Sequence, residues 1–177
     1  MSTDAPAKTL ILNVDDNDAA RYARGRVLQH AGYDVVDAAN GSDAMALASE
    51  RRPQVAVLDV HLPDINGLEL SRRIKTQWPD VMVLQTSATF ITAQDRARGL
   101  EGGADAYLIE PVDPGELVAT INALVRLRNA EDQLRRLNQS LEERIAERTQ
   151  RLHRANIGLI EQIARRERAE EVMLQAQ

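Results

Sequence analysis

The stretch VAVLDVHLPDINGLEL, residues 55–70, decides the fold. It opens with Val55–Leu58, an apolar run of strand length, and closes with a segment of helical spacing that begins at Leu68. The turn residues Asn66 and Gly67 separate the two, and an aspartate, Asp59, stands where the strand ends. This pattern predicts a buried strand followed by a helix, the repeating unit of an α/β fold.

The same alternation continues on both sides of this stretch. Strand-like apolar runs lie at residues 9–14, 34–36, 55–58, 81–84 and 107–109, and helical spacing marks residues 19–31, 42–51, 68–77 and 93–101. Five strands alternating with helices predict right-handed βαβ units and a parallel sheet. The nearly continuous apolar character of the strands is typical of a sheet covered by helices on both faces.

In such folds a ligand site lies beyond the carboxyl ends of the strands. Polar groups stand at four of these ends: Asp15-Asp16, Asp59, Thr86-Ser87 and Glu110-Pro111. One aspartate or serine there is often only a helix cap, but a set at the same sheet edge indicates a site. Carboxylates with carbonyl and water oxygens suit Mg²⁺ or Mn²⁺, and a carboxylate beside such a metal can accept a phosphoryl group. Asp59, on the central strand, is the best-placed nucleophile, with Asp15 and Asp16 holding the metal and Ser87 donating to a phosphoryl oxygen.

Composition excludes several other classes of protein. The 177 residues contain no cysteine, which excludes disulfides, thiolate zinc sites and cysteine nucleophiles. The net charge of −5 gives no reason to expect nucleic-acid binding. Without a membrane-spanning apolar run or a signal-peptide pattern, we expect a soluble cytoplasmic protein with no membrane partner.

Residues 8–125 resemble a response-regulator receiver domain of two-component signalling. The resemblance rests on ILNVDDN, VAVLDVHLPDINGLEL, VLQTSA, Tyr107 and the proline of EPVD. It implies a flavodoxin-like (βα)₅ fold with a five-stranded parallel sheet. It also implies phosphorylation of Asp59 by a histidine kinase or phosphotransfer protein, with Ser87 and Tyr107 as the switch pair. Mg²⁺ would then be bound by Asp15, Asp16, Asp59 and the backbone carbonyl of His61.

Glu110 departs from this family's pattern, which ordinarily has a lysine just before the proline. Two like charges ~4 Å apart at an effective dielectric near 20 repel by ~4 kcal/mol. The ionised carboxylates of Glu110 and Asp59 should therefore repel one another. Glu110 could turn out to solvent, which we favour, or stay inside as a protonated acid or metal ligand. Arg21, one turn into the first helix, could supply the missing positive charge. We expect metal binding to persist and phosphorylation, or its coupling to Ser87 and Tyr107, to be weakened.

The chain changes character near Pro114. From residue 116 to 177 it has no proline and one glycine, Gly158, and helix-forming residues dominate. Leucines at 127, 134 and 141 are seven residues apart, and Leu141, Leu152, Ile163 and Leu174 are eleven apart. Heptads followed by elevens predict a coiled coil. We therefore expect an N-terminal tail at 1–7, the receiver at 8–125, and a parallel homodimeric coiled coil at 126–177.

Residues 137–177 also resemble the signalling helix that precedes the catalytic core in many sensor histidine kinases. The chain contains no kinase machinery, so whether it is part of an enzyme stays open. If it is, the resemblance implies that the chain is the N-terminal fragment of a sensor histidine kinase. The leading hypothesis is a receiver that signals through a dimeric helix to a histidine kinase core. The alternative is a pseudo-receiver that serves for dimerisation or docking, with Glu110 impairing phosphorylation. A haloacid-dehalogenase-type phosphatase is disfavoured because His61 stands where those enzymes have a second aspartate.

Overall fold

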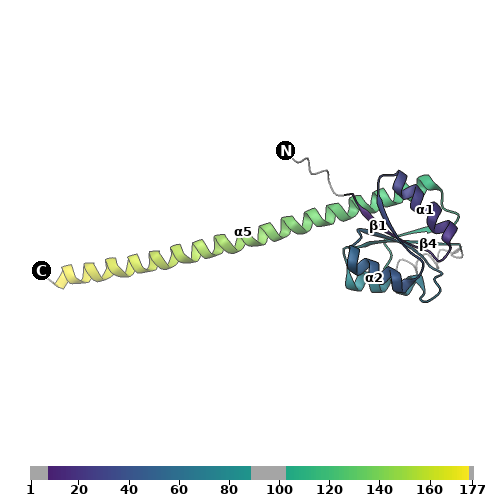
Figure 1. The fold of residues 1–177 in the computed structure, drawn as a ribbon. Coiled ribbons are helices and arrows are strands. Elements are labelled where there is room, and N and C mark those ends of the chain that lie inside the picture. Colours follow the sequence, from purple (N-terminus) through teal and green to yellow (C-terminus); the bar gives the residue numbers. More distant parts are fainter. Residues whose placement is uncertain (1–7, 89–102, 176–177) are drawn as a thin grey trace, which may run out of the picture. The chain divides into compact units, whose positions relative to one another are not determined.

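The computed structural model describes residues 8–88 and 103–175. Its sheet consists of β1 (Leu10–Val14), β2 (Asp34–Ala38), β3 (Val55–Asp59), β4 (Met82–Ser87) and β5 (Ala106–Ile109). All neighbouring strands are parallel, in the order β2-β1-β3-β4-β5. Figure 1 labels β1 and β4 within this sheet. This order is that of flavodoxin-like folds, and it places the ends of β1 and β3 side by side at the point where the winding reverses.

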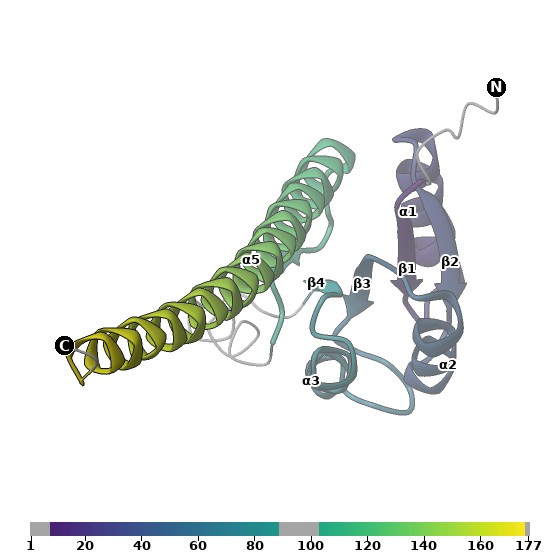
Figure 2. The same ribbon diagram turned by 90° about the vertical axis from the view of Figure 1, so that its left-hand side faces the viewer.

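The helices cover both faces of the sheet. α2 (Gly41–Arg51) and α3 (Gly67–Gln77) lie beside one another on one face, while α1 (Asp18–His30) covers the other (Figure 2). The first core, under α2 and α3, includes Leu58, Leu70 and Ile74. The second includes Leu28 of α1 and also Leu117 and Ile121, which belong to α5 (Pro114–Gln175). The prediction of a buried, doubly wound sheet is therefore confirmed.

The first three helices begin in the same way. Asn17, Asn40 and Asn66 are their N-caps, and each accepts hydrogen bonds from backbone N–H groups of the first turn. Asn17 and Asn66 lie in the loops that follow β1 and β3, so these caps fix the loops that carry the candidate site. The helix predicted at residues 93–101 lies outside the described residues.

α5 runs from Pro114 to Gln175 as one helix, and the chain divides into two compact units at Asn129 and Ala130. Within the second unit the helix exposes leucine and isoleucine side chains along its length, including Leu134, Leu141, Leu152 and Ile163. In the described part of the chain, no helix is both long enough and apolar enough to cross a bilayer.

Candidate functional site

Three aspartates meet at the carboxyl edge of the sheet. Asp15 and Asp16 follow β1 and Asp59 ends β3, and carboxylate oxygens of all three lie within 4.8 Å of one another. Asp15 is buried and Asp16 exposed, so the group opens to solvent on one side. The Asn17 N–H donates to Asp15 Oδ1 at 2.8 Å, which holds this carboxylate in the loop before α1. The sequence prediction that these aspartates gather is confirmed by this geometry.

Asp59 lies at the carboxyl end of the central strand. Its exposed fraction is 9%, and it pairs in register with Thr86 of β4. Burial raises the pKa of Asp59, and the negative charge of Asp15 raises it further. The backbone N–H of His61 opposes this by donating to the carboxylate, while the charge of Glu110 adds to the increase. The anionic form of Asp59 therefore costs free energy in the absence of a cation.

The close approach of α3 fixes the loop after Asp59. A Cβ atom on Gly67, the first residue of α3, would lie 2.2 Å from the Asp59 carbonyl oxygen and 2.7 Å from Val60 Cα. The Gly67 N–H donates to the Val60 carbonyl at 2.9 Å. Only glycine lets the helix start so close to the strand that carries the acid.

The remaining predicted site residues lie on neighbouring strands. Ser87 ends β4 and is fully buried. Tyr107, on β5, is half-buried and pairs in register with Gln85, two residues before Ser87. His61 lies just beyond β3 and is exposed. The sheet thus brings Ser87 and Tyr107 onto adjacent strands, whereas their coupling as a switch stays a prediction.

Glu110 directly follows β5. Its N–H donates to the Ser87 carbonyl at 3.0 Å, and its peptide bond to Pro111 is cis. Its side chain is 31% exposed and contributes to the wall of a cavity of about 540 Å³, lined mainly by apolar residues of α1 and the start of α5. We favoured a side chain turned out to solvent, and this expectation is not met in full. The carboxylate of Glu110 instead faces a cation.

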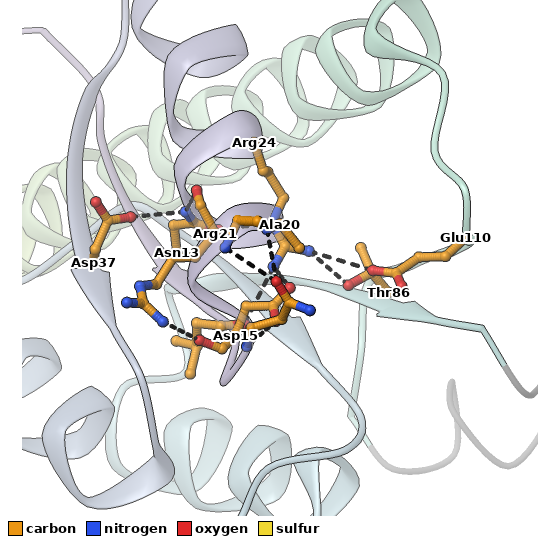
Figure 3. Close-up of polar contacts among 11 residues, drawn as sticks. Asn13, Asp15, Ala20, Arg21, Arg24, Asp37, Thr86 and Glu110 are labelled. Carbon is orange, nitrogen blue, oxygen red and sulfur yellow. Dashed lines mark hydrogen bonds and ion pairs between the residues drawn. The ribbon is translucent and has the colours of Figure 1, made fainter.

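That cation is Arg24 of α1, whose side chain is only 8% exposed (Figure 3). Its Nη2 donates to Asp15 Oδ2 at 2.5 Å, and its Nη1 lies 3.8 Å from Glu110 Oε1. Nη1 also donates to Thr86 Oγ1 at 2.7 Å, and Nε donates to Asn13 Oδ1 at 2.7 Å. The guanidinium therefore lies between two carboxylates and is held by two strands.

Arg21 does not take this position. It donates from Nη1 to the backbone carbonyl of Asp15 at 2.6 Å, and its Nη2 pairs with the exposed Asp18. Of the two lysines, Lys75 pairs with Asp105 at 2.6 Å, at the opposite end of β5 from Glu110. The cation beside Glu110 is therefore Arg24, one helical turn after Arg21, the residue suggested by the sequence.

Sequence reasoning missed Arg24, Asn13 and the role of Thr86. A signal was present, because Arg24 falls four residues before the fully buried Leu28 and so shares the inward face of α1. An arginine on that face, together with Asn13 inside the buried strand β1, indicates a buried polar network.

The donor set fits a hard divalent cation. Carboxylate oxygens of Asp15, Asp16 and Asp59 converge, and no sulfur or imidazole donor belongs to the group. An oxygen-only cluster with one exposed member matches the chemistry of Mg²⁺ or Mn²⁺, and the raised pKa of Asp59 marks a carboxylate that a cation would stabilise.

Comparison with known proteins identifies the relatives of this chain. The family model "Response regulator receiver domain" matches residues 11–122. The transcriptional regulatory protein PrrA of Mycobacterium tuberculosis is 37% identical over 120 residues, which are 68% of this chain and 51% of that protein. The response regulator MprA of Mycobacterium leprae is 38% identical over 122 residues, 69% of this chain and 53% of its own length. The chain thus spans about half the length of these curated relatives.

Solved structures agree with the family match. A CheY-like receiver domain protein from Methanospirillum hungatei has a TM-score of 0.67 at 27% identity, over 71% of this chain and 99% of that one. The chemotaxis protein CheY4 of Vibrio cholerae has a TM-score of 0.63 at 29% identity, over 67% and 99% of the two chains. Given the family match, the strand order and the three clustered aspartates, this chain belongs to the response-regulator receiver family of two-component signalling.

Proposed function

We propose that this receiver accepts a phosphoryl group on Asp59 from a histidine kinase or phosphotransfer protein. The observation that carries the proposal is the convergence of the Asp15, Asp16 and Asp59 carboxylates within 4.8 Å at the end of the central strand. Asp59 is buried at the carboxyl end of β3, and its carboxylate accepts a hydrogen bond from the backbone N–H of His61.

The reaction is a transfer from nitrogen to oxygen. One oxygen of the ionised Asp59 carboxylate forms a bond to phosphorus while the P–N bond of the donor phosphohistidine breaks. The imidazole nitrogen leaves with the bonding electron pair and takes up a proton. Because burial and neighbouring acids raise the pKa of Asp59, protons compete for the attacking oxygen, and acid pH opposes the transfer.

Asp15, Asp16, Asp59 and the backbone carbonyl of His61 would hold Mg²⁺ or Mn²⁺. When bound, the ion neutralises negative charge on the oxygens of the transferred group. Asp15 is held for this task by the Asn17 N–H and by Arg24, and Asp16 stays accessible from solvent. The hydroxyl of Ser87 would donate to a phosphoryl oxygen. Tyr107, on the neighbouring strand, would change its position in response, as the second residue of the switch pair.

The phosphorylated state would pass to an output through residues 126–177. We propose that this segment forms a parallel homodimeric coiled coil, because α5 exposes apolar side chains at intervals of seven and eleven residues. A histidine kinase core following the helix is the output that we favour. The relatives named above are transcriptional regulators or response regulators by name, so other outputs exist among proteins with this kind of receiver.

Phosphorylation is tested with phosphoramidate, a small P–N phosphodonor, and Mg²⁺. We expect intact-mass spectrometry to show one added phosphoryl group, which peptide mapping places at Asp59 and which EDTA and Asp59→Asn both abolish. A chain that takes up no phosphoryl group, although it is folded and binds Mg²⁺ in a calorimetric titration, contradicts the proposal. That result supports the pseudo-receiver, a dimerisation or docking module in which Glu110 impairs the chemistry.

A further inference from the structure

We propose that Arg24 of α1 supplies the positive charge that other receivers obtain from a lysine at the position of Glu110. Arg24 and Glu110 would then form a charge-exchanged version of the receiver site, with the cation on a helix and the carboxylate on β5. The inference rests on the proposed function, since it concerns how Asp59 can accept a phosphoryl group without that lysine. Arg24 is a positioning residue, because it acts through Asp15.

The contacts of Arg24 show a site built for a guanidinium. Nε donates to Asn13 Oδ1 and Nη1 to Thr86 Oγ1, each at 2.7 Å, while Nη2 donates to Asp15 Oδ2 at 2.5 Å and approaches the Val14 carbonyl at 3.4 Å. Asn13 and Thr86 are fully buried polar residues on two strands of the sheet. Without Arg24, the Asn13 Oδ1 and Thr86 Oγ1 atoms would lose this buried hydrogen-bond donor. Arg24, Asn13 and Thr86 therefore form one hydrogen-bonded unit.

The positive charge of Arg24 lies between the two acids that affect Asp59. Asp15 and Glu110 are the two acids whose negative charges raise the pKa of Asp59. Arg24 pairs with the first at 2.5 Å and lies 3.8 Å from the second. Removing this arginine leaves both acids uncompensated beside Asp59, in a region where low solvent exposure weakens screening. Figure 3 shows the guanidinium reaching from α1 to the strand ends between these groups.

This arrangement changes the expected result of replacing Glu110 by lysine. In the family's ordinary pattern that substitution would restore the site. Here the new ammonium group would replace one of the two carboxylates beside Arg24 with a like charge, close to a guanidinium that is only 8% exposed. Lysine at 110 should therefore restore the chemistry only when Arg24 has been removed.

The labelling experiment uses phosphoramidate and saturating Mg²⁺ on the full chain. We expect Arg24→Met to slow phosphorylation on the order of 100-fold, the scale of losing one preorganised charged group. Arg24→Lys keeps the charge and should label within about tenfold of the wild-type rate, although it loses the forked contacts to Asn13 and Thr86. Glu110→Lys alone should bring no gain, whereas Arg24→Met combined with Glu110→Lys should recover most of the lost rate. If the arginine were purely structural, Glu110→Lys would speed labelling in both backgrounds. Arg24→Gln replaces Arg24→Met if the latter fails to fold.

A second measurement needs neither metal nor phosphoryl transfer. Urea unfolding in EDTA of the wild type, Arg24→Met, Glu110→Lys and the double variant forms a double-mutant cycle. We expect the double variant to be more stable than additivity predicts, by at least about tenfold in the unfolding equilibrium constant, because the lysine no longer faces an arginine. Glu116→Lys, an exposed acid-to-lysine change in the first turn of α5, should give no coupling with Arg24→Met.

The two measurements separate the possible failures. A wild-type chain that is never labelled refutes the proposed function, whereas the unfolding cycle still decides whether residues 24 and 110 share one electrostatic site. Wild-type labelling rates in Arg24→Met, a double variant no faster than Arg24→Met, or an additive cycle would each overturn the inference.

Discussion

The candidate site depends on individual charges that are buried close together. Asp59 is buried beside Asp15, and Glu110 adds a further negative charge where receivers ordinarily have a lysine. Buried carboxylates of this kind persist only when each has a hydrogen bond or a cation. Asp59 has the N–H of His61, and Asp15 has Arg24. The residue that stabilises the group is therefore the arginine of α1, outside the loops that carry the acids.

This distribution explains which site residues the sequence could predict. Asp15, Asp16, Asp59 and Glu110 end apolar strands, so a parallel sheet must bring them to one edge. Arg24 lies in the middle of a helix, and its contact with Glu110 joins residues 86 positions apart in the chain. Arginines on helices are usually exposed, so only the packing of α1 against the sheet shows that this one is buried.

A pH-dependent test follows from the state of Asp59. Since the folded-state pKa of Asp59 is raised, ionising it costs stability, and the loss grows as pH rises from the unfolded value of about 4 through the folded value. In EDTA we expect Asp59→Asn to raise the urea midpoint at pH 7, with the gain shrinking toward pH 4. Urea unfolding followed by circular dichroism between pH 4 and 8 measures this.

Asp34→Asn is the matched control, because Asp34 is an exposed aspartate at the start of β2, the edge strand next to β1. It should give no comparable gain at pH 7. Equal gains from both variants, or a gain for Asp59→Asn that does not depend on pH, would show that the charge of Asp59 is not a cost in the folded protein.

At the scale of secondary structure, the loops after the strands are fixed by helix starts. Asn17 and Asn66 cap α1 and α3, and Gly67 lets α3 begin against the backbone of Asp59. The predicted elements that fall on described residues are present, with ends that differ by up to three residues, because alternating apolar runs and turn residues specify them locally. The close packing of Gly67 on Asp59 was not predictable, since it depends on how a helix and a strand meet.

Gly67→Ala tests this close packing. The added methyl group would lie 2.2 Å from the Asp59 carbonyl oxygen, a backbone atom that cannot move without shifting the loop after β3. We expect a loss of about 3 kcal/mol in unfolding free energy, the upper end of overpacking effects, and a lower affinity for Mg²⁺ in calorimetric titration. Gly25→Ala in α1 is the control, because its Cβ would make only ordinary contacts at 3.6 Å, so stability should be kept or increased. A stable Gly67→Ala with unchanged Mg²⁺ affinity would refute the packing argument.

At the scale of the whole chain, the long helix leaves a row of apolar side chains exposed. Leu134, Leu141, Leu152 and Ile163 are between 43% and 71% exposed in a single chain. A helix of 62 residues gains little from propensity alone and is stabilised by a packed face, which a second copy with the same spacing would provide. The spacing of the apolar residues could be predicted from the sequence. The number of helices in a coiled coil and their relative direction depend on contacts between chains.

Leu141→Glu tests the dimer on the full chain. Position 141 belongs to both the seven-residue and the eleven-residue spacing, so a glutamate there would place a charge in the middle of the seam. Losing a buried leucine costs about 2–5 kcal/mol. The dimer dissociation constant should therefore rise at least about 30-fold, which sedimentation velocity over a micromolar concentration series measures. Gln139→Glu introduces the same charge two residues earlier, on the opposite side of the helix, and should leave the dimer intact. A wild-type chain that is monomeric at micromolar concentration, or equal weakening by both variants, would contradict a dimer built on this seam.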